Sequence, residues 1–594
     1  MAALKAMGNL RPQFQLYLTF RKVWALFEVP EKRSFLLAFA MMVIGMGFEL
    51  LGIGIILPVL AVLAGESDGF SFPGIDWIRN ALPEGKFSVA IGGVLIGLFL
   101  MKNLFLGFQA WVQQRFIFRV QERLSFRLLQ KYLSLPYPFH LKRNSAQLIR
   151  NATSEMSQLV FNVVSPSMVL LTEIIVVAGI VGFLLIVYPA GTCTAAVILV
   201  LACCIYYAMV HRRLNRIGKQ RLVHEGLRIQ HIQQSLGGVK EVKLLGCEKT
   251  FLADYQTHNQ LVARASRLLA VSIQLPRLYL EVVGVVAFSA ILGMTVYEGQ
   301  SFAVVMPALG AMAVAAMRLI PSANRIVTSI TLLRFGSHGI DTISSEMLSD
   351  ADSDAIRDTG DGEVAGMTFA DRLVVDRVSF TYENVSEPAL SDVSFEIVKN
   401  TSTGIVGPSG SGKSTLVDLL LGLLKPQSGE ILVDQKNIHN NIRFWQDRIG
   451  YVPQQIFLYD DSLRRNVAFG IPAESIDDER VSKVLGMADL GDFLAELPDA
   501  LDTSLGERGV RLSGGQRQRI GIARALYRDP QILVFDEATS ALDYESEERV
   551  METIRGIQGH RTVIIVAHRL STVAQCEQLL RIEAGRLVSE PNNP

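Results

Sequence analysis

Six apolar runs in the first 335 residues constrain the fold most strongly. They cover approximately residues 34–64, 87–112, 159–187, 191–210, 275–297 and 302–333. Each has at least the roughly 20 residues that a helix needs to cross the hydrocarbon core of a bilayer. Inside a bilayer, a lone segment satisfies its own backbone hydrogen bonds only as a helix. The sequence therefore predicts a polytopic α-helical membrane domain with six spans.

The charged loops predict how this domain is oriented. Residues 113–157 and 211–270 are rich in Arg and Lys, and the helical pattern continues through both. Because basic loops stay in the cytoplasm, we expect these extensions, the N-terminus and the second half of the chain on the cytoplasmic side of a cell membrane. Residues 10–33 alternate aromatic and basic side chains, which predicts either an interfacial helix or a disordered basic lead. A short outer helix is expected around Trp77.

Length and composition set the remaining limits. The chain has 594 residues, too many for one core, and its formal net charge of zero argues against nucleic acid as a main partner. Its five cysteines are scattered, which is typical of reduced thiols. We expect an interfacial helix over 1–33, a transmembrane domain over 34–340, a linker over 341–370 and a soluble α/β domain over 371–594.

A glycine-rich stretch in the second half predicts a phosphate-binding loop. It follows a short apolar strand, opens an apolar helical run, and reads Gly407, Pro408, Ser409, Gly410, Ser411, Gly412, Lys413, Ser414 and Thr415. In this pattern the backbone N–H groups cradle phosphates, Lys413 reaches the β- and γ-phosphates, and the Ser414 hydroxyl is offered to Mg²⁺. The alternative is a chance glycine-rich turn.

Two further features accompany that loop. Asp536 ends the apolar run 532–535, where an α/β sheet places a Mg²⁺ ligand, and Glu537 follows it as a candidate to polarise water. The alternative is a solvated acidic pair that caps the next helix. A turn of Ser513, Gly514, Gly515 and Gln516 precedes a basic amphipathic helix. Such a turn is a second anion site and suggests a composite nucleotide site.

The order and spacing of residues 407–415, 512–516, 532–537 and 540–543 resemble the ATP-binding cassette of ABC transporters. The resemblance implies ATP and Mg²⁺ as ligands, with Ser414, Gln454 and Asp536 at the metal. It implies that Tyr382 stacks on adenine and that His568 contacts the γ-phosphate. Glu507 and Asp543 match positions linked to coupling. Lys413, Gln454, Glu537 and His568 would then form the catalytic set.

The membrane domain precedes the cassette, as in the exporter type of this family. One chain carries one cassette and six spans, and its catalytic motifs are complete. In this family the signature turn of one cassette closes on the ATP held by another. The resemblance therefore implies a homodimer with two equal composite sites, acting as an ATP hydrolase coupled to transport.

Basic residues inside the predicted spans suggest an anionic substrate. They are Lys102, Arg277, Arg318 and Arg325. Charge at membrane depth is costly and is usually functional, so a basic cavity for a phosphate or diphosphate is one reading. The other is that these residues pair with Glu49, Glu173 and Glu281, or snorkel to the interface.

A narrower set of features resembles bacterial lipid-linked oligosaccharide flippases: Glu49, the segment around Trp77, the stretch 137–145, and the pair Arg318 and Arg325, which are seven residues apart. That narrower resemblance implies outward flipping of a polyprenyl-diphosphate-linked oligosaccharide. The alternatives are an exporter of another amphipathic substrate, such as lipid A, a peptide or a drug, and an ATP-gated channel or regulatory subunit.

Overall fold

The computed structural model describes residues 12–63, 84–187, 189–297, 302–348, 369–383, 385–506, 509–538, 544–557, 559–567 and 569–588. The chain divides into two compact units. The first comprises residues 1–134 and 143–350, and the second comprises residues 135–142 and 351–594. The limits of the interfacial helix and of the linker stay predictions.

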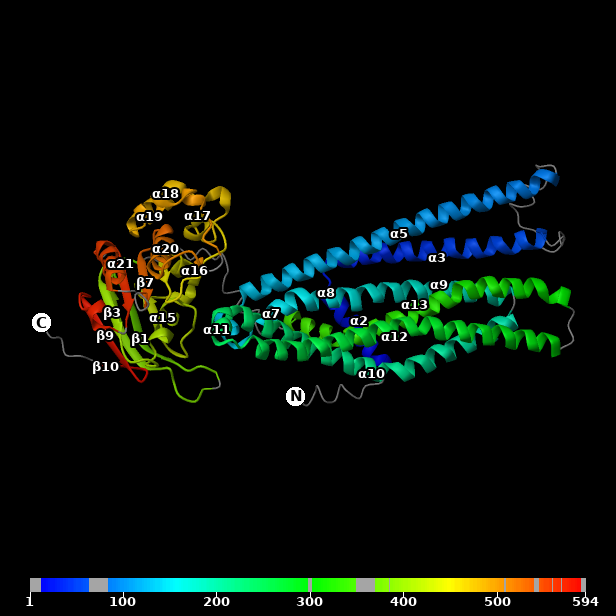
Figure 1. Ribbon diagram of the computed structural model, residues 1–594, viewed down its shortest axis with the longest axis horizontal. Coiled ribbons are helices and arrows are strands. Elements are labelled where there is room, and N and C mark those ends of the chain that lie inside the picture. Colours follow the sequence, from blue (N-terminus) through cyan, green and yellow to red (C-terminus); the bar gives the residue numbers. More distant parts are fainter. Residues whose placement is uncertain are drawn as a thin grey trace. The chain divides into compact units, whose positions relative to one another are not determined.

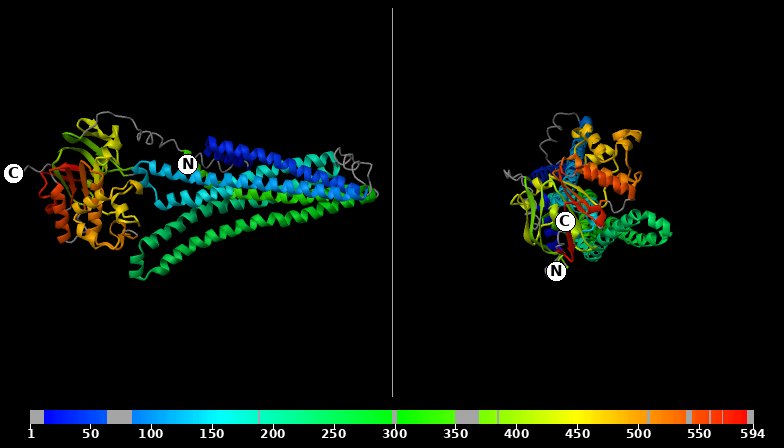
Figure 2. Two further views of the ribbon diagram at one scale, coloured as in Figure 1. Left: turned by 90° about the horizontal axis from the view of Figure 1, so that it is seen from above. Right: turned by 90° about the vertical axis from the view of Figure 1, so that its left-hand side faces the viewer.

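The first unit is a bundle of long helices (Figures 1 and 2). It contains α2 (Pro12–Leu26), α3 (Val29–Leu63), α5 (Glu84–Ser134), α7 (Ser145–Arg150), α8 (Met156–Leu159), α9 (Ser165–Val187), α10 (Pro189–Gly237), α11 (Val239–Leu245), α12 (Glu248–Tyr297) and α13 (Phe302–Leu348). Helices α10 and α12 run side by side and are joined by the short α11 (Figure 2). The lengths of α5, α10 and α12 agree with the expectation that spans continue as helices beyond the membrane.

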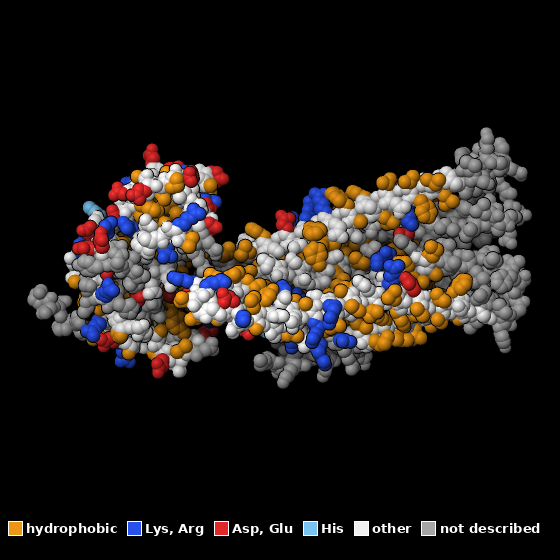
Figure 3. All heavy atoms as spheres, viewed as in Figure 1, with side chains coloured by type: hydrophobic (Ala, Val, Ile, Leu, Met, Phe, Trp, Pro, Cys, Tyr) orange, Lys and Arg blue, Asp and Glu red, His pale blue; other side chains and the backbone are white. Residues whose placement is uncertain are grey.

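Within the described residues, five stretches are long and apolar enough to cross a membrane. They are Val29–Gly52, Gly92–Ser134, Ser145–Ile186, Thr192–Val210 and Glu248–Ala290. Many apolar side chains are exposed on the face of this unit that Figure 3 shows. Leu100, Leu104 and Phe108 on α5 are among the exposed apolar residues. Side chains of α13 before Ala316 lie outside the described residues, and so does the segment around Trp77. The sixth span therefore stays a prediction.

Two π-helical segments interrupt the helix that leads into the third span. They are η1 (Asn151–Glu155) and η2 (Val160–Val164). Each inserts an extra residue into the helical ladder, and such segments frequently lie at functional positions. The fully buried Glu155 in η1 forms an ion pair with Arg221 of α10 at 3.0 Å. No pattern in the sequence predicted these irregularities.

The second unit contains two sheets (Figure 1). A six-stranded sheet has the order β10-β9-β3-β8-β7-β6 and is parallel except for β10, while a four-stranded antiparallel sheet has the order β2-β1-β4-β5. The strands are β1 (Arg372–Phe380), β2 (Leu390–Val398), β3 (Ser402–Val406), β4 (Ser428–Val433), β5 (Lys436–Asn437), β6 (Ile449–Val452), β7 (Ile532–Asp536), β8 (Thr562–Val566), β9 (Gln578–Glu583) and β10 (Arg586–Val588).

Helices and short turns make up much of the rest of the described second unit. They are α6 (Tyr137–Lys142), α15 (Lys413–Leu420), α16 (Ile442–Gln446), α17 (Leu463–Val467), α18 (Asp478–Met487), α19 (Gly491–Glu496), α20 (Gly514–Tyr527), α21 (Tyr544–Ile557) and α22 (Leu570–Val573), with 3-10 turns η4 (Ile438–Asn440), η5 (Ala473–Ser475) and η6 (Ala500–Asp502). One core forms between the two sheets around α15, and another forms beneath α18 and α20. The predicted fold class, a helical membrane domain followed by an α/β phosphate-loop domain, is confirmed.

Candidate functional site

The phosphate loop joins β3 to α15 in the second unit. All five residues of β3 are buried, and the strand lies between β8 and β9. Gly412 has a φ of +105°, and a Cβ at this position would lie 2.5 Å from the backbone oxygen of Ala389. Only glycine therefore fits this turn without strain. The loop thus places the N-terminus of α15 at the carboxyl edge of the sheet, where phosphates bind in such folds.

Lys413 lies at the first position of α15 and is buried. Its Nζ donates hydrogen bonds to the backbone oxygens of Gly407 and Pro408, both at 2.9 Å. Burial lowers the pKa of Lys413, while the charges of Glu537 and Asp536 oppose that shift. A partly desolvated ammonium held over the loop is well placed to bind an anionic phosphate oxygen.

A cavity of about 270 Å³ lies over this loop. The loop residues that line it are Ser409, Gly410, Gly412, Lys413, Ser414 and Thr415, and Tyr382, Ala389 and Glu537 complete its wall. The Tyr382 hydroxyl is hydrogen-bonded to Thr415 Oγ1 at 3.2 Å, and its ring meets Phe380 edge-on. The structure therefore brings the predicted adenine-stacking residue and the predicted water-polarising residue to the same cavity as the phosphate loop.

The two adjacent carboxylates lie at the end of β7 in different environments. Burial raises the pKa of Asp536, and a hydrogen bond from the Tyr451 hydroxyl partly offsets that shift. Glu537 has a φ of +49°, a left-handed conformation that costs a non-glycine residue about 1–3 kcal/mol. Its backbone N–H donates to the Val566 oxygen at 3.0 Å, and its Oε2 accepts from Gln454 Nε2 at 2.7 Å. The turn therefore directs the two carboxylates differently.

The donor set at this edge fits Mg²⁺. Asp536 is a half-buried carboxylate whose raised pKa reflects a charge that lacks full compensation. The hydroxyl of Ser414 and the amide oxygen of Gln454 are hard oxygen donors, which Mg²⁺ prefers together with water and phosphate. Among the described residues no cluster of three His, Cys, Asp or Glu side chains could hold a metal. That observation is compatible with Mg²⁺, which rarely uses an all-protein cage.

The signature turn begins helix α20. Ser513 Oγ accepts from the Gln516 backbone N–H at 3.2 Å, and Gln516 Oε1 accepts from the Ser513 N–H at 2.9 Å. This reciprocal cap fixes Ser513, Gly514, Gly515 and Gln516 at the start of a 14-residue helix. Three other predicted site residues, Glu507, Asp543 and His568, lie outside the described residues.

Three of the four candidate substrate residues form ion pairs in the helical unit. Lys102 Nζ lies 2.8 Å from Glu49 Oε2, Arg277 Nε lies 3.0 Å from Glu281 Oε1, and Arg325 Nε lies 2.5 Å from Glu173 Oε1. The side chain of Arg318 lies outside the described residues. The pairing alternative thus describes these three residues, and a substrate contact by any of the four stays a prediction.

Two groups of residues were missed by the sequence analysis. Tyr451 was given no role by the sequence analysis, although its hydroxyl donates to Asp536. Small residues in α10 and α12, including Ala195, Ala196 and Gly284, surround an apolar cavity in the helical unit. Their recurrence within the fourth and fifth spans was a usable signal, because small residues mark positions where helices approach closely.

Comparison with known proteins agrees with this geometry. Residues 34–307 match the family model of the ABC transporter transmembrane region, and residues 390–540 match the ABC transporter model. A protein of Cupriavidus metallidurans named ATP-dependent lipid A-core flippase is 30% identical over 574 residues, which cover 96% of this chain and 93% of that protein. A protein of the same name from Thiobacillus denitrificans is 30% identical over 503 residues, covering 83% and 84% of the two chains.

A solved structure has the same fold. It is the structure of a bacterial Atm1-family ABC exporter with ATP bound, with a TM-score of 0.77 and 24% identity, and the match covers 94% of this chain and 95% of that one. With a membrane region and an ATP-binding cassette fused in one chain and near full-length similarity to ABC flippases, the protein belongs to the ABC transporters and is an ATP-driven exporter.

Proposed function

We propose that this exporter is a homodimeric flippase that moves an anionic amphipathic lipid of the lipid A-core class outward across the bacterial inner membrane. The observation that carries the proposal is the similarity over 96% of the chain to a relative named for that activity. It favours the alternative given in the sequence analysis, lipid A, over the polyprenyl-diphosphate oligosaccharide. The basic extensions support a cytoplasmic location for the N-terminus and the cassette.

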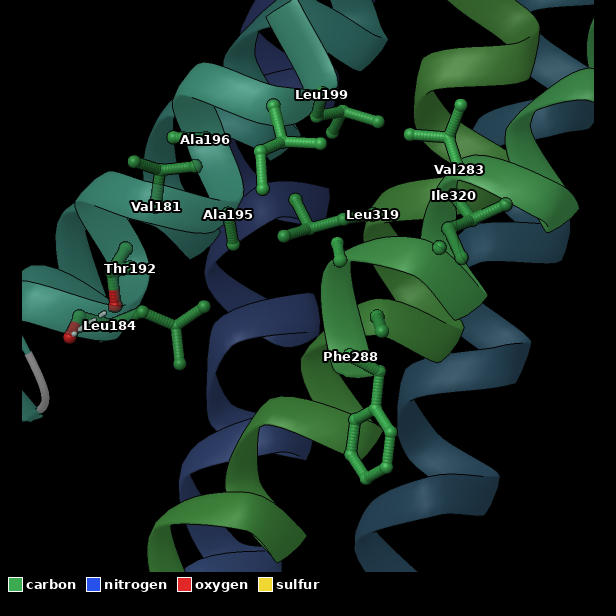
Figure 4. A pocket seen from close by; sticks show the side chains of 14 residues that line it. Val181, Leu184, Thr192, Ala195, Ala196, Leu199, Val283, Phe288, Leu319 and Ile320 are labelled. Atoms are coloured by element: carbon green, nitrogen blue, oxygen red, sulfur yellow. Dashed lines mark hydrogen bonds between the residues drawn. The ribbon is translucent and has the colours of Figure 1, made fainter. Parts of the chain in front are cut away.

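An apolar cavity in the helical unit supports a substrate with hydrocarbon chains. It has a volume of about 100 Å³ and lies between α9, α10, α12 and α13. Figure 4 shows Val181 of α9, Leu199 of α10, and Leu319 and Ile320 of α13 around it. The hydroxyl of Thr192 donates to the Leu184 backbone oxygen at 3.1 Å, so this polar group already has a partner. Such a cavity suits a short stretch of one hydrocarbon chain better than water.

The anionic part of the substrate would be recognised by basic residues at membrane depth. Arg325 is the candidate proposed for this contact, because its side chain is 42% exposed while Glu173, on another helix, pairs with its Nε. Guanidinium groups bind phosphate oxygens with two parallel hydrogen bonds. An amphiphile with phosphate groups and acyl chains satisfies both this arginine and the apolar cavity.

ATP hydrolysis would be carried out by the residues around the phosphate loop. Lys413 and the loop N–H groups bind the phosphates, and Tyr382 stacks on adenine. Glu537 orients and polarises the attacking water, and a hydrogen bond from Gln454 holds the Glu537 carboxylate in place. The developing charge on the γ-phosphate is stabilised by Lys413 and by His568. A bound Mg²⁺, held by Ser414, Gln454 and Asp536, supplies neutralisation of phosphate charge.

Two copies of the chain are needed for this scheme. The capped turn Ser513–Gln516 presents the N-terminus of α20, which suits the phosphates of an ATP held by a second copy. Closure of the two cassettes would drive the outward-facing state, and phosphate release would reverse it. Glu507 and Asp543 are proposed to act in this coupling.

The test is transport in proteoliposomes that contain purified protein. Lipid A-core and a polyprenyl-diphosphate oligosaccharide would be offered separately, with and without ATP. We expect ATP-dependent movement of lipid A-core by the wild type and none by Glu537→Gln. Movement of the polyprenyl lipid alone would restore the first reading from the sequence. ATP hydrolysis without movement of either lipid would refute the flippase proposal and leave another amphiphile as substrate.

A further inference from the structure

Tyr451 lies beside the candidate Mg²⁺ ligand as a direct result of strand register. Strands β6 and β7 are parallel neighbours, and Tyr451 pairs with Val534. Side chains on a strand alternate between the two faces of a sheet, so Tyr451, Val534 and Asp536 project from the same face. Asp536 is two residues beyond Val534, or about 6.6 Å along the strand, which a phenol ring can span. The Tyr451 hydroxyl accordingly lies 3.3 Å from Asp536 Oδ2.

The Tyr451 hydroxyl is the donor in this contact. An ionised carboxylate only accepts hydrogen bonds, so the phenol supplies the proton. The ring is partly buried and packs against the core that forms between the two sheets. Packing of the ring therefore fixes where the hydroxyl lies, and the hydroxyl in turn limits rotation of the Asp536 carboxylate.

The same short segment also holds the neighbouring carboxylate. Gln454 lies three residues beyond Tyr451 and donates from Nε2 to Glu537 Oε2 at 2.7 Å. Tyr451 thus binds Asp536, and Gln454 binds the adjacent Glu537. Since the two carboxylates have different predicted roles, each requires its own orientation, and one strand end supplies both constraints.

We propose that Tyr451 is a positioning residue for ATP hydrolysis, whose hydroxyl orients the Asp536 carboxylate for the divalent cation that accompanies ATP. Hydrogen bonds to metal-binding carboxylates fix their direction, and loss of such a partner typically weakens metal affinity 10- to 100-fold. The role concerns the ATPase and does not depend on which lipid is moved.

The test compares Tyr451→Phe with Tyr459→Phe in the full-length protein. Tyr451→Phe removes only the hydroxyl that reaches Asp536. Tyr459 is a matched control in the same unit, because its ring stacks on Phe469 with centroids 4.7 Å apart. Both changes are made in a Glu537→Gln background, so that bound ATP is retained while Mn²⁺ binding is measured by electron paramagnetic resonance.

We expect Tyr451→Phe to weaken Mn²⁺ binding to the ATP-loaded protein about tenfold, with ATP binding in EDTA changed less than twofold. When Tyr451→Phe is made alone, with the native Glu537 retained, the Mg²⁺ concentration that gives half-maximal ATPase activity should rise by a similar factor. Tyr459→Phe should change neither quantity. Unchanged Mn²⁺ affinity in Tyr451→Phe would overturn the proposal. So would an equal loss of metal-free ATP binding, because that result would indicate a general structural role.

Discussion

Breaking the Glu49–Lys102 ion pair should destabilise the helical unit more than removing both charges. The two charged atoms lie 2.8 Å apart, and the side chains of Glu49 and Lys102 are only 3% and 14% exposed. At an effective dielectric constant of 20, the attraction at this distance is about 6 kcal/mol. Desolvation of both charges offsets most of that attraction, whereas one charge left buried alone costs about 3–5 kcal/mol.

We therefore expect Glu49→Gln and Lys102→Met each to lower the free energy of unfolding by about 3 kcal/mol or more. The double variant should lie within about 1 kcal/mol of the wild type, because no uncompensated charge remains. Gly52 favours this near-native stability of the double variant, because it leaves room for an apolar side chain at position 102. A Cβ at position 52 would lie 3.3 Å from Lys102 Nζ, so the lysine side chain packs directly against the backbone of α3.

The assay is a double-mutant cycle on the purified protein, with reversible unfolding followed in mixed micelles of a mild and a denaturing detergent. Lys243 and Glu248 provide a control cycle in the same unit, in the predicted cytoplasmic extension 211–270, since their side chains are 70% and 39% exposed. Their coupling should be below about 1 kcal/mol. Strictly additive losses for Glu49 and Lys102 would refute the reasoning, because additivity means that the two charges do not depend on each other.

Three further outcomes follow from the structure. Glu537→Gln should lower ATP turnover at least about 100-fold while ATP binding persists, measured by phosphate release and equilibrium binding. Ala195→Phe fills the apolar cavity and should reduce lipid movement several-fold in proteoliposomes with basal ATPase retained, whereas Val197→Phe, at a site 66% exposed on the same helix, should change neither. Burial raises the pKa of Asp418 to about 6 from an ordinary value of 3.8, so its folded state disfavours the charged form. Asp418→Asn should therefore raise the free energy of unfolding by about 1 kcal/mol at pH 7.5, after a discount for partial exposure, and that gain should fade as the pH falls through 6 towards 4.

The sequence predicted those parts of the site that depend on local spacing. The loop before Lys413 and the acids at 536 and 537 are each set by one strand and the turn after it, so a short stretch of chain contains the whole signal. The order of these stretches then indicated the family, and through it the fold. The same holds for the membrane domain, because each span is identified by its own apolar length.

Features that depend on pairing between distant segments could not be predicted in this way. The contact of Tyr451 with Asp536 depends on the register of two strands that are more than 80 residues apart. The partner of Arg325 is Glu173, on another helix, and nothing in either helix specifies how the two rotate against each other. The sequence analysis could therefore name both the basic cavity and the ion pairs as alternatives without deciding between them.

The exposure of their side chains distinguishes Lys102, Arg277 and Arg325 as candidate substrate contacts. Lys102 is enclosed by Glu49 and the backbone at Gly52, so its charge is already matched inside the bundle. Arg277 is open, but its partner lies one turn away on the same helix and moves with it. Arg325 differs from both, because a buried glutamate on another helix holds it through Nε while 42% of its side chain stays accessible. A guanidinium has four further N–H donors, so the phosphate contact proposed for Arg325 would leave its pair with Glu173 intact.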